Sequence, residues 1–290
     1  MDIVLALAAA LFFAFGTVLQ QRAGLEKPAE GSSAGLLVQM AKRPVWLAGI
    51  AADGLGFLCQ AVALAVGRLA VVQPLLVTTV VFALPLGARF TGQKVRRLDV
   101  GAALVVVLAL VAFLTIANPS GGNDDAPLAE WAIAIGACVG ICVPLFALGR
   151  FGSPPRRAAA LGTATGILFA LSAAFTKVVA DQFEEGVFEI FVNWHLYALL
   201  VVGYASMTFN QLALNTGSLA PAVATSLAFD PIASVILGVT LLNESLHTSP
   251  AGIAGTVLAL AAALGGMVVL ARSQSASEGP KPVEPAAATA

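Results

Sequence analysis

The chain has 290 residues, of which 59% are hydrophobic and only 11% are charged, and its formal net charge is −1. A soluble domain carries roughly 25% charged residues, so this composition cannot cover a water-exposed surface. The nearly neutral charge argues against a nucleic-acid partner, because phosphate binding requires a basic face. The sequence therefore predicts an all-α integral membrane protein whose main partner is the lipid bilayer.

Nine apolar stretches are long enough to cross a hydrocarbon core, which takes about 20 helical residues at about 1.5 Å rise each. In chain order, the predicted spans are 3–19, 44–66, 69–88, 100–117, 131–149, 158–176, 191–214, 219–242 and 251–271. Between the first two spans, residues 23–42 are expected to form an interfacial segment with a short helix at 36–40. The tail from 273 to 290 is rich in Ser, Pro, Ala and Glu, which predicts disorder on the cytoplasmic side.

The fifteen Lys and Arg residues are sorted by loop. Thirteen fall in alternate loops on one side, Arg68 alone falls on the other, and Lys177 lies near the end of the sixth span. The side of Arg68 holds the acidic loops around 124–130 and 181–189. Because cytoplasmic loops carry the positive excess, we expect a multi-pass cell-membrane protein with its N-terminus outside and its C-terminus in the cytoplasm.

An internal repeat is suggested by a shift of 150 residues, which aligns 57–70 with 207–220 and matches Ala63-Leu64 with Ala213-Leu214. A slip of one residue then pairs Gly101 with Gly252. The predicted organisation is a first four-helix repeat at 1–117, a linking helix at 127–149 and a second four-helix repeat at 158–272. An odd number of spans per repeat and linker inverts the second copy, which is the architecture of secondary transporters. Two Ala/Leu/Gly-rich helices that align by chance remain the alternative.

The second half carries Ala213-Leu214, Gly217-Ser218-Leu219-Ala220, Pro231, Leu241-Leu242-Asn243-Glu244-Ser245-Leu246 and Gly252. This pattern resembles the drug/metabolite transporter (DMT) superfamily, in particular EamA-type proteins, over about residues 1–272. Phe15-Gly16 and Leu19-Gln20, together with nine spans, look more like the NIPA-type magnesium transporters. The terminal glutamate of the first EamA repeat is Gln93 here, and the second helix of that repeat is reduced to the segment after Ala23. The resemblance implies transport of a small solute by alternating access and no cofactor.

Two carboxylates are predicted deep in the membrane, where ionisable groups are costly and usually functional. Asp53 lies about 13 Å into the second span and Asp230 about 17 Å into the eighth, at about 1.5 Å per residue. One central Asp costs about 2.5 to 3.5 kcal/mol of insertion free energy, so a reason for it should exist. We expect Asp230 and Asp53 to relay protons or to bind the solute or a coupling ion. A protonated carboxyl that merely bonds two helices together is the structural alternative.

Other candidate site residues are uncharged. Pro231 and Pro74 are predicted helix breaks, because proline removes a backbone donor and frees a carbonyl one turn earlier. Gln73, beside Pro74, and the amides of Gln60, Asn210 and Gln211 are candidates to line a solute cavity or, equally, to bond helix to helix.

Several residues are expected to be structural. Lys177 is predicted to snorkel to the interface, and His195 and His247 to be solvated. Close helix packing is expected at two Gly-x-x-x-Gly pairs, Gly136 with Gly140 and Gly162 with Gly166. The three cysteines, Cys59, Cys138 and Cys142, are interpreted as small buried hydrophobes, and no metal site is expected.

The leading hypothesis is therefore a DMT/EamA-type transporter for a small molecule or ion, with proton coupling as a candidate mechanism. A NIPA-like permease for magnesium or another cation is the alternative. A lipid-handling protein and an intramembrane enzyme are less favoured: the flanks of Asp53 and Asp230 do not match the Gly-x-Gly-Asp of presenilin-like proteases, and the sequence lacks His-Glu-x-x-His, Gly-x-Ser-x-Gly and P-loop motifs.

Overall fold

A computed structural model describes residues 1–26, 42–92, 94–123, 125–246 and 249–277 of the chain. Its helices are α1 (Asp2–Glu26), α3 (Pro44–Val66), α4 (Leu69–Leu76), α5 (Thr78–Phe90), α6 (Arg97–Ala117), α7 (Leu128–Leu148), α8 (Pro154–Glu185), α9 (Val187–Val192), α10 (Trp194–Leu214), α11 (Leu219–Thr240) and α12 (Pro250–Ser277). Two short strands, β1 (Ser120–Gly121) and β2 (Glu244–Ser245), pair antiparallel.

Within these described ranges, nine helices are long and apolar enough to cross a membrane, with α4 and α5 together forming the third. This confirms the predicted number of spans and a multi-pass membrane protein. The predicted interfacial helix at 36–40 lies outside the described residues. The predicted tail begins too early, because α12 continues to Ser277; residues 278–290 lie outside the described part.

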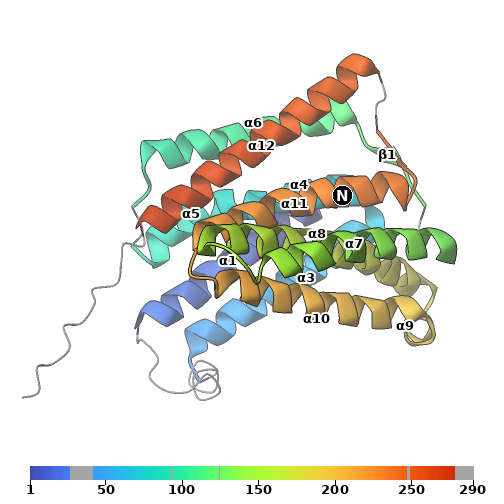
Figure 1. The fold of residues 1–290 in the computed structure, drawn as a ribbon, viewed down its shortest axis with the longest axis horizontal. Helices are drawn as coiled ribbons and strands as arrows, with labels where there is room; N and C mark the ends of the chain where they lie inside the picture. The colour runs from blue at the N-terminus through green and yellow to red at the C-terminus, as the bar shows by residue number, and fades with distance from the viewer. Residues whose placement is uncertain (27–41, 93, 124, 247–248, 278–290) are drawn as a thin grey trace, which may run out of the picture.

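α8 is the central helix of the bundle (Figure 1). It is 32 residues long, and α11, α10, α7 and α3 pack against it. On the other side of the core, α1 packs against α3, α4 and α5, while α6 and α12 lie side by side at one edge (Figure 1). The core between them is made by small and branched side chains such as Ala6, Leu64, Val72 and Leu171.

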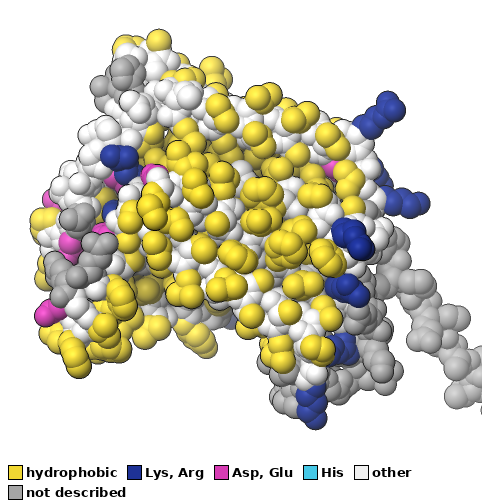
Figure 2. Space-filling model, turned by 180° about the vertical axis from the view of Figure 1, so that it is seen from behind, with side chains coloured by type: hydrophobic (Ala, Val, Ile, Leu, Met, Phe, Trp, Pro, Cys, Tyr) yellow, Lys and Arg dark blue, Asp and Glu magenta, His cyan; other side chains and the backbone are white. Residues whose placement is uncertain are grey.

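The outer surface is a band of apolar side chains, as expected for helices that face lipid. In Figure 2 most of the Lys and Arg side chains in view lie at one end of the molecule and most of the Asp and Glu side chains at the opposite end. We call these the basic end and the acidic end. Between them Leu104, Leu108 and Val201 are each more than half exposed, which a bilayer tolerates and water does not.

Pro74 and Pro231, the two predicted helix breaks, have different effects on their helices. α4 ends at Leu76, two residues after Pro74, and α5 begins at Thr78. The hydroxyl of Thr78 donates to the carbonyl of Leu75 at 2.6 Å, so the break is satisfied internally. α11, by contrast, runs continuously through Pro231, and the predicted helix break is absent there. A proline costs one backbone bond, and tight packing of α11 on α8 keeps the helix intact around it.

Candidate functional site

Asp230 lies where α11 crosses α8. Its Oδ1 accepts a 3.3 Å hydrogen bond from the hydroxyl of Ser234, one turn further along α11. The two backbones approach closely, because a Cβ added at Gly166 would lie 2.6 Å from the carbonyl oxygen of Ser226 and 2.8 Å from the backbone nitrogen of Asp230. The carboxyl is therefore held at a tight helix crossing with one neutral, long hydrogen bond.

The two Gly-x-x-x-Gly pairs also differ. Gly162 and Gly166 both lie at the α8–α11 crossing, and a Cβ at Gly162 would meet the carbonyl oxygen of Ala222 at 2.3 Å. This matches the packing that was predicted. A Cβ at Gly136 or Gly140 would meet nothing within 4 Å, so the packing prediction for that pair is wrong.

Asp53 lies where α3 crosses α1. Its carboxylate accepts a hydrogen bond from the amide of Gln20. A Cβ at Gly16 would overlap the Asp53 carboxylate, at 1.8 Å from Oδ1, so the glycine makes the room that this side chain occupies. Asp53 remains partly exposed.

The structure does not gather the predicted site residues into one place. Asp53 sits on the α1–α3 crossing and Asp230 on the α8–α11 crossing. Gln73 is 3% exposed in α4, and its Nε2 has no hydrogen-bond partner among the described residues. Gln60 on α3 and Asn210 on α10 are partly buried, whereas Gln211 is exposed. Pro74 is buried beside Gln73, and Pro231 follows Asp230 in α11.

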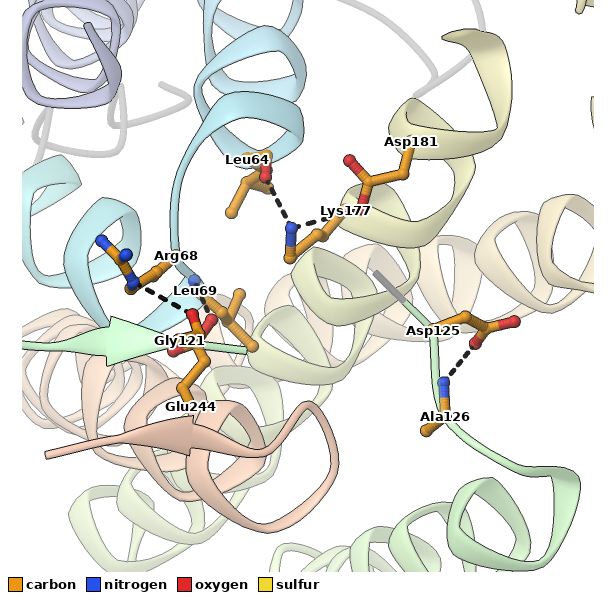
Figure 3. A network of polar contacts seen from close by, with 9 residues as sticks. All are labelled: Leu64, Arg68, Leu69, Gly121, Asp125, Ala126, Lys177, Asp181 and Glu244. Carbon is orange, nitrogen blue, oxygen red and sulfur yellow. Dashed lines mark hydrogen bonds and ion pairs between the residues drawn. The ribbon is translucent and has the colours of Figure 1, made fainter. Parts of the chain in front are cut away.

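A buried group of polar contacts at the acidic end was not predicted from the sequence (Figure 3). We call it the outer cluster; its members are Leu64, Arg68, Leu69, Ala70, Gly121, Lys177, Asp181 and Glu244. Glu244, 2% exposed, accepts hydrogen bonds from the backbone nitrogens of Leu69 at 2.6 Å and Ala70 at 2.9 Å. These are the first N–H groups of α4, which have no partner within their own helix, so Glu244 caps α4 from a loop far along the chain.

Lys177 supplies the second connection. Its ammonium group donates to the carbonyl of Leu64 at 3.1 Å and forms an ion pair with Asp181 at 3.2 Å. Lys177 is only 5% exposed, so the predicted snorkelling is wrong. The reason is that α8 continues nine residues past its predicted end and presents Lys177 to the last turn of α3 instead of to the interface.

Two further contacts close the outer cluster. The guanidinium of Arg68 donates through Nε to the carbonyl of Gly121 at 3.1 Å. Gly121 in β1 is paired with Glu244 in β2. Burial raises the pKa of Glu244, while its bonds to Ala70 and Leu69 and the nearby charges of Lys177 and Arg68 oppose the rise. The cluster thus joins the ends of α3, α4 and α8 to the loops that follow α6 and α11.

An aromatic cluster lies beside it. Trp131 stacks on Phe175 with ring centroids 4.3 Å apart, and Trp194 meets both rings edge-on. His195 is 4% exposed; its Nδ1 lies 3.0 Å from the amide of Gln182, and its Nε2 lies 3.3 Å from Asp125 without hydrogen-bond geometry. The prediction that His195 is solvated is therefore wrong, and His247 lies outside the described residues.

Among the residues that the structure describes, no three His, Cys, Asp or Glu side chains are grouped as metal ligands. The predicted burial of Cys138 and Cys142 is confirmed, and Cys59 is partly buried.

No family model matches the chain, and no solved structure matches it. The chain is 32% identical over 247 residues to an uncharacterized protein of Corynebacterium glutamicum, and the match covers 84% of this chain and 86% of the relative.

Proposed function

We propose that this chain, which belongs to the same family as the Corynebacterium glutamicum protein, is a secondary transporter of the DMT type. It moves a small solute across the cell membrane by alternating access between two inverted halves. Asp230 carries the coupling proton or binds the solute. The N-terminus is outside, which makes the acidic end extracellular and the basic end cytoplasmic.

The observation that carries the proposal is the incomplete hydrogen bonding of the Asp230 carboxyl group. A carboxylate near the middle of an apolar helix costs insertion free energy, and a purely structural one should be fully hydrogen-bonded. Its side-chain bond within the described residues is a single 3.3 Å contact with a neutral hydroxyl. A carboxyl that is neither paired with a cation nor fully bonded is suited to exchange a proton or take up a ligand.

Matching helix crossings support two related halves. Under the shift of 150 residues, Asp53 of the α1–α3 crossing corresponds to Gly203. Under a shift of 156 residues, which aligns Phe13-Ala14 with Phe169-Ala170, Gly16 of the same crossing corresponds to Ser172. Gly203 and Ser172 face each other across the α8–α10 crossing, where a Cβ at Gly203 would lie 3.9 Å from the Ser172 hydroxyl. Each crossing thus pairs a glycine with a polar side chain. The glycine is on the first helix of the pair in the α1–α3 crossing and on the second helix in the α8–α10 crossing.

The outer cluster supports alternating access. It ties α3 and α4 of the first half to α8 and β2 of the second half by polar contacts at the acidic end, whereas α6 and α12 join the halves by apolar packing. The third span changes partners along its length, since α4 packs mainly against α11 and α1, whereas α5 packs mainly against α1. A rocking mechanism requires contacts that hold the two halves together at one end and that can be broken.

The test uses purified protein in liposomes that contain a pH-sensitive dye. Amino acids, sugars, nucleotide conjugates, amines and Mg²⁺ are added outside in turn, and movement of protons or solute is recorded. At least one solute should move protons with the wild type. Asp230→Asn, which keeps the shape but cannot release a proton, should bind that solute but neither accumulate it against a gradient nor move protons.

Ser234→Ala is the matched control, because it removes the hydrogen bond to Asp230 but keeps the carboxyl. It should transport and retain the pH dependence. Undiminished gradient-driven accumulation by a well-folded Asp230→Asn variant would rule out the coupling role, and Mg²⁺ uptake without proton movement would favour a cation permease.

A further inference from the structure

A pocket lined in part by arginines lies at the basic end, and neither membrane carboxylate lines it. It has a volume of about 380 Å³ and is lined by Phe146, Gly149, Arg150, Arg157, Leu161 and Leu212. These residues come from the end of α7, the start of α8 and the end of α10, which all meet at the same end of the bundle. Both α7 and α10 pack against α8, so Leu161 of α8 forms the floor between them.

Two arginines give the pocket its charge. Arg157 is held in place because its Nε donates to the carbonyl of Gly149 at 2.9 Å, and its terminal nitrogens make no hydrogen bond within the described residues. The guanidinium of Arg150 lies 5.8 Å from the centroid of the Phe146 ring. No acidic side chain is among the lining residues. Two guanidinium groups without a carboxylate are complementary to a phosphate.

The remaining walls identify the source of that phosphate. Phe146, Leu161 and Leu212 are apolar, and Leu212 is 41% exposed at the rim. Phe146 contacts Phe209 with ring centroids 5.4 Å apart, which holds the Phe146 ring against α10. The flanking helices are peripheral, since only 22% of the α7 span and 11% of the α10 span are buried inside the protein. A headgroup held here can therefore lay its acyl chains over Leu212 and into the bilayer.

We propose that this pocket binds the headgroup of an anionic phospholipid, with its phosphate between Arg150 and Arg157. The inference rests on the proposed orientation, in which the basic end is cytoplasmic, and not on transport. Basic pockets between helix ends on the cytoplasmic side suit anionic lipid headgroups, which concentrate in that leaflet. Bound lipid bridges the ends of α7 and α10 and stabilises the folded protein by mass action.

The experiment titrates phosphatidylglycerol, and in parallel phosphatidylcholine, into the purified full chain in a neutral detergent while thermal unfolding is followed. Phosphatidylglycerol should raise the midpoint and phosphatidylcholine should not. Arg150→Gln should weaken the phosphatidylglycerol effect about tenfold or more, because a charge-assisted contact is lost. Arg150 makes no side-chain hydrogen bond within the described residues, so this variant should fold.

Arg156→Gln is the matched control, because Arg156 is exposed in the same turn of chain and does not line the pocket. It should keep the wild-type response. Equal weakening by Arg150→Gln and Arg156→Gln would overturn the proposal in favour of general charge attraction. Equal stabilisation of the wild type by inorganic phosphate would overturn it in favour of a free-anion site. Native mass spectrometry provides the second readout: a phosphatidylglycerol retained by the wild type should be lost from Arg150→Gln.

Discussion

The carboxylate of Glu244, in the loop between α11 and α12, accepts a 2.6 Å hydrogen bond from the backbone nitrogen of Leu69 at the start of α4. The two residues are 175 positions apart in the chain. A cap usually comes from a residue next to its helix, so this contact joins the two halves as well as ending a helix. A Cβ at Gly238 would lie 2.4 Å from Glu244 Oε2, which shows how tightly the carboxylate is enclosed.

Replacing Glu244 should destabilise the protein in a graded way. Glu244→Ala leaves two buried N–H groups without an acceptor, which costs about 1 to 3 kcal/mol for each group. Glu244→Gln retains one carbonyl acceptor and should lose less. Thermal unfolding in detergent measures both, with Ser245→Ala, an exposed neighbour, as the control that should stay at the wild-type value.

The stability should also depend on pH through Glu244. Burial raises its pKa above the ordinary 4.5, so the folded state keeps the proton to a higher pH than the unfolded state does. Its contribution to stability is therefore fully present below pH 4.5 and is lost as the pH rises through the raised pKa. Subtracting the unfolding midpoints of Glu244→Gln from those of the wild type across this range isolates the effect. A difference that grows with pH would contradict the raised pKa.

Lys177 and Asp181 should behave as a buried pair. Their side chains are 7% and 14% exposed, so Lys177→Met removes the ammonium group from a largely buried ion pair. Loss of one partner from a buried pair costs about 3 to 5 kcal/mol. The double variant Lys177→Met/Asp181→Asn should recover much of that loss in unfolding experiments. A double variant no more stable than Lys177→Met would show that the bond to Leu64, and not the ion pair, is what matters.

The two Gly-x-x-x-Gly pairs offer a matched comparison. Gly166→Ala places a methyl group against the backbone of α11, and overpacking of this kind costs about 1 to 3 kcal/mol. Gly136→Ala meets open space, and the better helix propensity of alanine should leave stability unchanged or raise it by up to about 1 kcal/mol. Thermal unfolding of both variants in one detergent measures the difference; a Gly166→Ala variant as stable as Gly136→Ala would mean that the α8–α11 crossing is looser than described.

Topology can be tested with single cysteines in a background where Cys59, Cys138 and Cys142 are replaced by alanine. Cysteines at Asn123 and Glu189, both exposed at the acidic end, should react with a membrane-impermeant maleimide added to intact cells. A cysteine at Arg156, exposed at the basic end, should react only after the membrane is opened. The reverse labelling pattern would invert the proposed orientation.

The spans were predictable because a helix must be long and apolar to cross a bilayer. Each such helix is one continuous stretch of sequence, so its composition alone identifies it. The ends of the spans were less predictable, since the polar residues that finish α8 continue the helix and are paired in the folded state. Glu244 was recognised only as part of a family-like motif. Its partners Leu69 and Ala70 contribute backbone nitrogens, which nearly every residue type has, so the sequence does not identify them. His195 looked exposed for a related reason: its neighbours Asp125 and Gln182 come from other segments.

The distant cap on α4 also sets an order of events during synthesis. The backbone nitrogen of Leu69 can donate its hydrogen bond to Glu244 only after 175 more residues have been made, which takes about 9 to 35 s at about 5 to 20 residues per second. Until then the amide groups that begin α4 must be satisfied by water or lipid headgroups at the membrane surface. The third span should therefore reach its final depth only after the eighth has left the ribosome, so a nascent chain stalled before residue 244 should leave residues near Leu69 open to water-borne reagents.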